Sequence, residues 1–152
     1  MAFPGVDMTI SETAFDLDQF LPYLLNQAAE ATALSFQSTY QTTYGLSRTG
    51  WRVMAHLGKF GEMSARDICA RSHMEKTKVS RAVAALEGAG WISRRVSPQD
   101  RRAEMLALTD AGRMVFVDLG RRANEYDQTL RQLLGPDLAA QLDDALRQLI
   151  RR

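Results

Sequence analysis

The sequence has almost no cysteine, few histidines and no long apolar run, and each shortage excludes a class of protein. Its one cysteine, Cys69, cannot form a disulfide framework within the chain. The two histidines, His56 and His73, are too few and too isolated for a metal site, and no cysteine-rich pattern indicates zinc. No run of about 18 apolar residues occurs, so we expect no membrane span.

The sequence also lacks a secretory leader and a catalytic motif. MAFPGVDMTISETAF, at its start, has neither a basic segment nor an apolar block, so we expect no signal peptide and a cytoplasmic location. Serine, histidine and aspartate occur, but no motif brings them together, so we expect neither an enzyme nor a cofactor. A hydrophobic content of 45% and a charged content of 24% are typical of a globular protein.

Charge is unevenly distributed along the chain, although the formal net charge is only +1. Residues 48–102 contain 12 lysines and arginines against 5 acidic residues, whereas the rest contains 7 basic and 13 acidic residues. A basic middle part between acidic ends predicts one module that meets a polyanion and another that does not. Chance clustering is the alternative.

Hydrophobic periodicity and turn residues predict a mainly helical chain. Apolar residues at helical spacing predict a helix within 15–44, which Gly45 ends. A short helix over 47–57 has Ser47 as its cap, and Ser64 with Asp67 forms a capping box for a helix over 65–71. The later elements are a helix at 75–88, strands at 91–96 and 103–108, a helix from a cap at Thr109 to about Leu134, and a helix at 137–151.

The order helix, short helix, helix, hairpin over residues 47–108 is that of a winged helix-turn-helix. In the helix at 75–88, Val79, Val83 and Leu86 form an inward stripe. The residues on the other side suit base edges and phosphates of duplex DNA: Lys76, Thr77, Lys78, Ser80 and Arg81. A solvated helix face is the alternative for these residues. Ser64 either donates to a phosphate or only caps its helix, and capping is favoured.

The loop of the hairpin, VSPQDRRAEMLALT at 96–109, places Arg101 and Arg102 next to each other. By itself such a pair is a solvated surface feature, a structural ion pair with Asp100, or a probe for an anion. A hairpin tip beside a DNA-binding helix can insert arginine into a minor groove, where narrow A·T-rich tracts carry enhanced negative potential. The basic surroundings favour this third interpretation.

Residues 67–113 resemble the multiple-antibiotic-resistance regulator (MarR) family. They read DICARSHMEKTKVSRAVAALEGAGWISRRVSPQDRRAEMLALTDAGR. The most specific part is Asp100-Arg101-Arg102, a D-x-R wing signature, followed by LALT at 106–109. WRVM at 51–54 also resembles the second helix of that family. The pattern covers about 46–113, and the flanking helices fit the family's dimerisation region by position and periodicity only.

The resemblance implies a winged helix-turn-helix with a two-stranded wing at 46–109, and dimerisation helices at 1–45 and 110–152. Such proteins act as homodimers on short palindromic operators, often as repressors, and many release DNA when a small aromatic or phenolic ligand binds. By analogy, Asp100 pairs with Arg102 and leaves Arg101 to enter the minor groove, with the reverse assignment left open. Glu75 departs from the aspartate that is usual at this helix start and is a poorer cap.

A ligand pocket for an aromatic carboxylate, a phenol or a related thioester has several candidate residues: Tyr23, Gln27, Phe36, Tyr40, Arg48, Trp51, Arg52 and Met114. The alternative is that the rings fill the core and that the arginines form ion pairs. Cys69 is expected to pack in the core rather than sense oxidants, because buried thiols are usually inert.

These observations predict a ligand-responsive transcriptional repressor that binds duplex DNA as a homodimer. Two other classes stay open. The first is a DNA-binding architectural protein without an effector, and the second is a winged helix used for protein contact. Ligand-induced thermal stabilisation separates the first from a repressor, and salt-dependent DNA binding tests the second.

Overall fold

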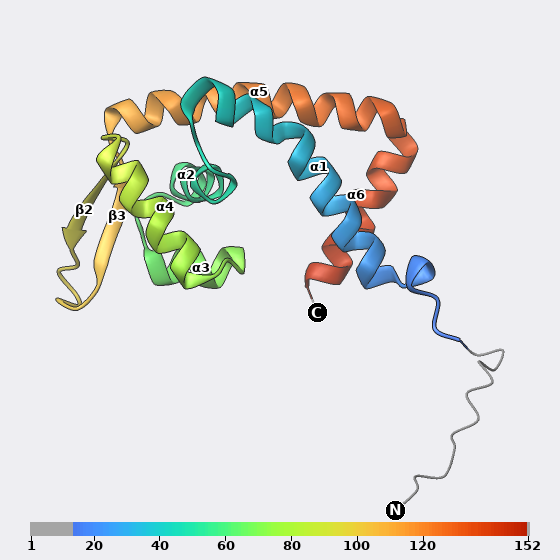
Figure 1. The fold of residues 1–152 in the computed structure, drawn as a ribbon, viewed down its shortest axis with the longest axis horizontal. Helices are drawn as coiled ribbons and strands as arrows, with labels where there is room; N and C mark the ends of the chain where they lie inside the picture. The colour runs from blue at the N-terminus through green and yellow to red at the C-terminus, as the bar shows by residue number, and fades with distance from the viewer. Residues whose placement is uncertain (1–13, 152) are drawn as a thin grey trace, which may run out of the picture. The chain divides into compact units, whose positions relative to one another are not determined.

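The computed structural model describes residues 14–151, and six α-helices and three short strands account for most of them (Figure 1). A 3-10 turn, η1 (Leu17–Gln19), precedes the first helix. The elements that follow are α1 (Leu21–Tyr44), α2 (Arg48–Phe60), β1 (Met63–Ser64), α3 (Ala65–Ser72), α4 (Lys76–Gly88), β2 (Ile92–Val96), β3 (Glu104–Leu108), α5 (Asp110–Leu134) and α6 (Pro136–Ile150). The mainly helical fold with a β-wing is confirmed. In residues 14–151 no helix is long and apolar enough to cross a membrane.

The chain forms two compact units, with the boundary inside α1, after Ser35. In the first unit, the hydroxyl groups of Thr32 and Ser35 donate to the carbonyls of Ala28 and Ala31, one turn earlier. Several large apolar side chains of this unit are exposed: Phe15, Leu17, Phe20, Leu21, Leu24 and Leu34. The helix begins at Leu21, and the residues before it form the turn η1, which the periodicity of 15–44 did not predict.

The helix starts of the second unit follow from local hydrogen bonds. The Ser47 hydroxyl accepts from the Gly50 N–H, and the Thr109 hydroxyl accepts from the Gly112 N–H. Ser64 and Asp67 form a complete capping box at α3, as predicted. Glu75 makes no side-chain cap hydrogen bond at α4, which agrees with the expectation that it is a poor cap.

The wing is part of a three-stranded antiparallel sheet with strand order β1-β3-β2. In the hairpin, Ile92 is opposite Leu108 and Val96 is opposite Glu104. The two-residue strand β1 was not predicted, because two residues give no periodicity signal. It pairs Met63 with Leu106 and therefore attaches the start of α3 to the wing.

The core of the second unit lies around α2, which packs against α4 on one side and α5 on the other (Figure 1). Two close contacts at glycines define this packing. A Cβ at Gly112 would lie 1.9 Å from the Trp91 carbonyl oxygen, and a Cβ at Gly58 would lie 2.4 Å from the Phe116 ring. Glycine is therefore required where α5 crosses the start of the wing.

Candidate nucleic-acid interface

Helix α4 presents a polar, cationic face to solvent. Its Val79, Val83 and Leu86 are buried, as the inward stripe predicted. Its candidate DNA contacts are all exposed: Lys76, Thr77, Lys78, Ser80 and Arg81. Within residues 14–151 only Lys78 among them has an ion pair, at 3.9 Å from Glu75. A surface pair of this length adds little stability, so the face is available to an anionic partner.

The turn between α3 and α4 is fixed by hydrogen bonds that sequence reasoning missed. The buried Ser72 donates its hydroxyl to the Ile68 carbonyl at 2.5 Å and accepts from the Met74 N–H at 3.3 Å. His73 adopts the left-handed conformation, with φ of 55°. Arg52, from α2, donates to the Ser72 carbonyl at 2.8 Å. The guanidinium of Arg52 therefore connects α2 to the turn that positions α4.

Ser64 lies at the start of α3, where its hydroxyl accepts from the Asp67 N–H at 3.1 Å. The Asp67 carboxylate accepts in return from the Ser64 N–H at 3.3 Å. These bonds occupy one lone pair of the hydroxyl and leave its proton available to a phosphate. Capping and phosphate contact are thus compatible, and the phosphate contact stays a prediction.

The wing tip is shaped by a network of short-range hydrogen bonds. The Ser97 N–H donates to the Ala103 carbonyl at 2.8 Å, and the Ala103 N–H donates to the Asp100 carbonyl at 3.0 Å. One Asp100 carboxylate oxygen accepts from the backbone N–H of Arg102 at 2.9 Å. Asp100 therefore stiffens the turn as expected, but through the backbone of Arg102. The ion pair expected between Asp100 and an arginine side chain is absent from residues 14–151.

The four arginines of the wing differ in their partners. Arg94 donates to Glu87 at 2.8 Å and to Glu104 at 2.5 Å. Arg95 donates from Nε and Nη2, along one edge of its guanidinium, to the two carboxylate oxygens of Glu62. The hydrogen bond from Arg95 also lowers the pKa of the Glu62 carboxyl below its usual range.

By contrast, Arg101 and Arg102 are exposed, and in the described part of the chain their guanidinium groups have no ion pair or hydrogen bond. Two of the wing's four cations are therefore neutralised locally. The two at its tip keep their charge for an external anion, and the structure gives no reason to prefer one of them.

A cluster of aromatic rings lies where α1, α2 and α5 meet in the second unit. The ring of Phe36 stacks on Tyr126 with centroids 5.3 Å apart and meets Trp51 edge-on at 5.7 Å. Tyr40 stacks on Trp51 at 6.1 Å. Burial raises the pKa of Tyr40, and the positive charge of Arg48 offsets part of this effect. The structure thus brings together three of the candidate ligand residues and adds Tyr126, which sequence reasoning missed.

Arg48 is near enough to Tyr40 to affect its pKa, and the remaining four candidate ligand residues lie in different places. Tyr23 is half-buried and Gln27 is exposed, both in the first unit. Arg52 binds the α3–α4 turn, and Met114 lies on a solvent-facing side of α5. Cys69 is half-buried and packs against the core, in keeping with a packing role.

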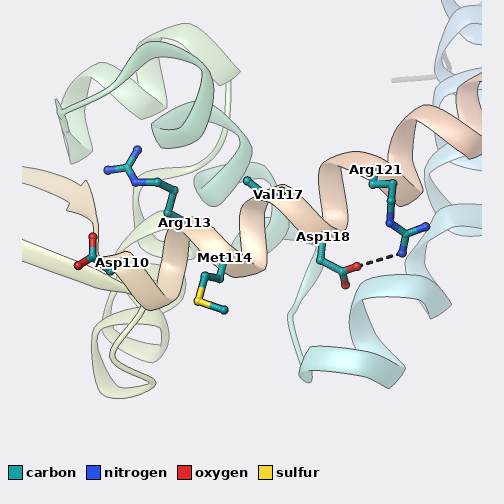
Figure 2. A pocket seen from close by; sticks show the side chains of 6 residues that line it. All are labelled: Asp110, Arg113, Met114, Val117, Asp118 and Arg121. Atoms are coloured by element: carbon teal, nitrogen blue, oxygen red, sulfur yellow. Dashed lines mark hydrogen bonds and ion pairs between the residues drawn. The ribbon is translucent and has the colours of Figure 1, made fainter.

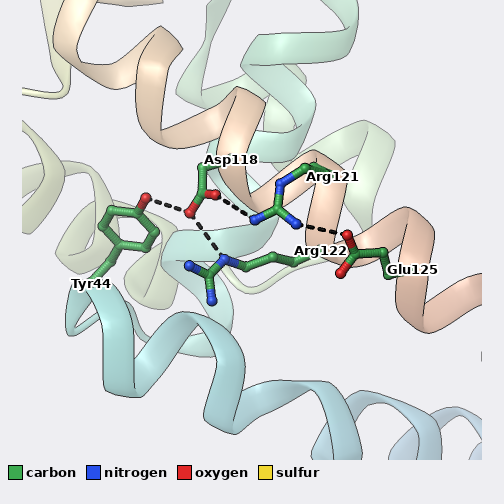
Figure 3. Close-up of polar contacts among 5 residues, drawn as sticks. All are labelled: Tyr44, Asp118, Arg121, Arg122 and Glu125. Carbon is green, nitrogen blue, oxygen red and sulfur yellow. Dashed lines mark hydrogen bonds and ion pairs between the residues drawn. The ribbon is translucent and has the colours of Figure 1, made fainter.

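A polar network joins α1 to α5 (Figure 3). The Tyr44 hydroxyl donates to the Asp118 carboxylate at 2.6 Å, and Arg121 and Arg122 each donate to the same carboxylate at 3.0 Å. The hydrogen bond from Tyr44, with those of the arginines, lowers the pKa of Asp118. The i, i+3 and i, i+4 spacing within α5 is a signal that sequence reasoning left unused. The contact to Tyr44 spans 74 positions and has no local signal.

The exposed cationic helix, the short helix before it and the arginine-tipped hairpin define a winged helix-turn-helix. A sequence model described as the MarR family matches residues 44–103. The regulator FarR of Neisseria gonorrhoeae is 24% identical over 125 residues, which are 82% of this chain and 85% of FarR.

Among solved structures, the transcriptional regulator PA4135 is 29% identical, with a TM-score of 0.79 over 87% of this chain and 96% of its own. The MarR-family regulator SPO1453 of Silicibacter pomeroyi DSS-3 is 27% identical, with a TM-score of 0.77 over 91% of this chain and 98% of its own. The chain is therefore similar to the MarR family over residues 44–103, and it shares the fold of these transcriptional regulators over most of its length.

Two structures of lower identity share the fold and concern small aromatic acids. BpsR of Bordetella bronchiseptica is 20% identical, with a TM-score of 0.79 over 91% of this chain and 99% of its own. Its DNA binding is regulated by 6-hydroxynicotinic acid. NadR is 23% identical, with a TM-score of 0.76 over 87% of this chain and 96% of its own. Its structure was solved in complex with 4-hydroxyphenylacetate.

Proposed function

We propose that the chain is a repressor that binds a pseudo-palindromic duplex site as a homodimer and releases it when a small aromatic acid or phenol binds. The observation that carries the DNA part is the set of exposed cations on α4 and at the wing tip, of which, in residues 14–151, only Lys78 has an ion pair. Arg81, with Ser80 and Thr77, suits base edges, and Lys76 and Lys78 suit phosphates. Arg101 and Arg102 suit the minor groove beside them.

The dimer is supported by apolar side chains that a monomer leaves in water. Residues at both ends of the chain are involved: Phe20, Leu21, Leu24 and Leu34 of the first unit, and Leu138, Leu142, Leu149 and Ile150 of α6. Exposed apolar residues in such numbers mark an interaction surface. A two-fold dimer of winged helices then reads half-sites about one helical turn apart.

The effector is proposed to bind beside the aromatic cluster of Phe36, Tyr40, Trp51 and Tyr126, where Arg48 supplies a cation for a carboxylate. Trp51 precedes Arg52 in α2, and Arg52 holds the turn before α4 through the Ser72 carbonyl. A ligand that shifts α2 therefore also shifts the DNA-reading helix. BpsR and NadR share this fold, which makes small aromatic acids the first ligands to test.

A salt titration of DNA binding tests the DNA part of this proposal. We expect the affinity for a selected duplex site to fall steeply with salt, since bound lysines and arginines release counterions from phosphates. Lys76→Ala should reduce the slope of log K against log [salt] by about 1, with sequence preference unchanged. Arg81→Ala should instead relax preference at one base pair, at a cost of about 1–3 kcal/mol. Absence of binding to any duplex at low salt would favour the protein-contact alternative.

The effector is tested by thermal unfolding with 4-hydroxyphenylacetate and 6-hydroxynicotinate, with the non-aromatic cyclohexylacetate as control. A ligand that binds only the folded state at 100 times its Kd adds about 2.7 kcal/mol of stability, which raises the melting temperature by several degrees. We expect an aromatic acid, and not the control, to raise it and to release DNA. If aromatic acids change neither quantity while DNA binding persists, the effector-independent alternative is correct.

A further inference from the structure

The wing is tied to the rest of the second unit by ion pairs that join different elements. Several ion pairs of residues 14–151 link side chains three or four positions apart in one helix, as Asp118 and Arg121 do in α5 (Figure 2). Arg95 of β2 instead binds Glu62, which lies 33 positions earlier, between α2 and β1. A pair of this kind fixes the placement of one element on another.

The two arginines of β2 hold this strand from opposite faces of the sheet. Successive side chains of a strand point to opposite faces. Arg94 is opposite the buried Leu106, so it lies on the core-facing side, where it donates to Glu87 in the last turn of α4. Arg95 lies on the other side and donates to both carboxylate oxygens of Glu62. The strand is therefore joined to α4 on one face and to the segment before α3 on the other.

The pair of Arg95 and Glu62 reaches across the central strand of the sheet. In the order β1-β3-β2, the strands β1 and β2 are the two edges. Arg95 is opposite Met105, which also pairs with the end of β1, and only Val96 follows it in the ladder before the tip. A two-stranded ribbon twists more than a larger sheet does. The last tie to the third strand therefore determines where the tip points.

We propose that Glu62 and Arg95 are positioning residues for DNA binding. Their ion pair sets the angle of the wing at which Arg101, Arg102 and helix α4 contact one duplex together. The inference rests on the wing-tip contacts of the proposed function and adds the side chains that aim them. Neither Glu62 nor Arg95 touches DNA in this role.

Stability of the fold does not account for an acid at this place. The side chain of Arg95 is 55% exposed and that of Glu62 is 30% exposed, and ion pairs with such exposure contribute little to stability. Glu62 also lies two residues before Ser64, which is predicted to contact a phosphate. A carboxylate there opposes the approach of DNA by its charge. A geometric role offsets this cost.

Replacement of the Glu62 carboxylate by its amide tests the sign of the effect. By charge alone, Glu62→Gln should strengthen DNA binding, because the local potential becomes more positive. We expect it instead to weaken binding about fivefold, which is what the loss of a good exposed ion pair amounts to. Fluorescence anisotropy measures the affinity for a duplex that the wild-type protein selects from a random library. Circular dichroism and thermal unfolding check that the variant is folded.

The matched control is Glu75→Gln, at the start of α4. Glu75 is an exposed acid of the same lobe, and its ion pair, with Lys78 at 3.9 Å, is local. Glu75→Gln should bind the selected duplex at least as tightly as wild type, since it removes an acid and no tie between elements. If Glu62→Gln also binds more tightly than wild type, Glu62 has no positioning role and the proposal is overturned.

A second comparison asks whether Glu62 acts through the wing tip. In the Arg101→Ala/Arg102→Ala background, Glu62→Gln should no longer weaken binding, because no guanidinium remains at the tip to be misplaced. The same fivefold loss in both backgrounds would mean that Glu62 acts on α3 instead, and it overturns the proposal.

A third comparison keeps the charge of Arg95 and changes its geometry. Arg95→Lys cannot span both oxygens of Glu62, so it should weaken binding about as much as Glu62→Gln does. The double variant Glu62→Gln/Arg95→Lys should be no weaker than either single variant, whereas losses that add overturn the pairing. A wild-type chain that binds no duplex at low salt overturns the DNA binding of the proposed function itself. If Arg101→Ala/Arg102→Ala binds like wild type, the wing-tip contacts and this inference are both wrong.

Discussion

Gly112→Ala is expected to lower the free energy of unfolding by about 3 kcal/mol, at the upper end of what an overpacked site costs. A Cβ at this position would lie 1.9 Å from the carbonyl oxygen of Trp91, which is backbone and cannot move aside as a side chain can. The same carbonyl accepts from the Thr109 N–H at 3.0 Å, so displacing it also weakens the start of α5. Chemical denaturation at a fixed protein concentration measures the loss.

The matched control lies in the same helix. Gly120 has nothing within 4 Å of a built Cβ. Gly120→Ala should therefore add about 0.5–1 kcal/mol of stability, the ordinary preference of a helix for alanine over glycine. Equal effects of the two substitutions would mean that α5 does not approach Trp91 as closely as described.

Loss of both arginines at the wing tip is expected to weaken specific DNA binding by about 100-fold, if each guanidinium contributes about 1.4 kcal/mol, the low part of the range for charged contacts. Arg101→Ala and Arg102→Ala should each cost about tenfold, because neither side chain is held by Asp100. The double variant should keep the dimer dissociation constant and helix content of wild type. Fluorescence anisotropy on the selected duplex site measures the affinities.

Two substitutions of Asp100 separate its role in the turn from any hold on an arginine. Asp100→Asn keeps an oxygen that accepts from the Arg102 N–H and removes a negative charge near the DNA, so it should bind DNA at least as tightly as wild type. Asp100→Ala removes the acceptor and should weaken binding. If the asparagine variant loses as much affinity as the double arginine variant, the wing tip does not work as proposed.

The elements of the fold were predictable because their signals are local. Ser47, Ser64 and Thr109 cap the helices that the sequence assigns to them, and the Gly135-Pro136 break separates α5 from α6. The strand β1 was not predictable in this way. Its two residues are a strand only because Leu106 and Met105, over 40 positions later, pair with them.

In the candidate site, too, the features with local signals were predictable and the contacts between distant residues were not. The exposed face of α4 follows from helical periodicity and was predicted residue by residue. The contacts of Arg52 with Ser72, of Arg95 with Glu62 and of Tyr44 with Asp118 join residues 20, 33 and 74 positions apart. No local pattern encodes such pairs. The resemblance to the family implied that Asp100 pairs with the Arg102 side chain, whereas its carboxylate accepts from the backbone N–H of Arg102 in the tight turn.

The pairing of β1 with β3 has a mechanical consequence. Ser64, the first residue before α3, is opposite Met105 in the wing, so the hairpin and the helix-turn-helix are joined by backbone hydrogen bonds. Because α3 packs on α4, we expect the hairpin and α4 to move together. In the proposed dimer, we therefore expect an effector that shifts α2 to move the whole DNA-binding lobe as one unit. DNA release would then follow from a change in the separation and angle between the two lobes.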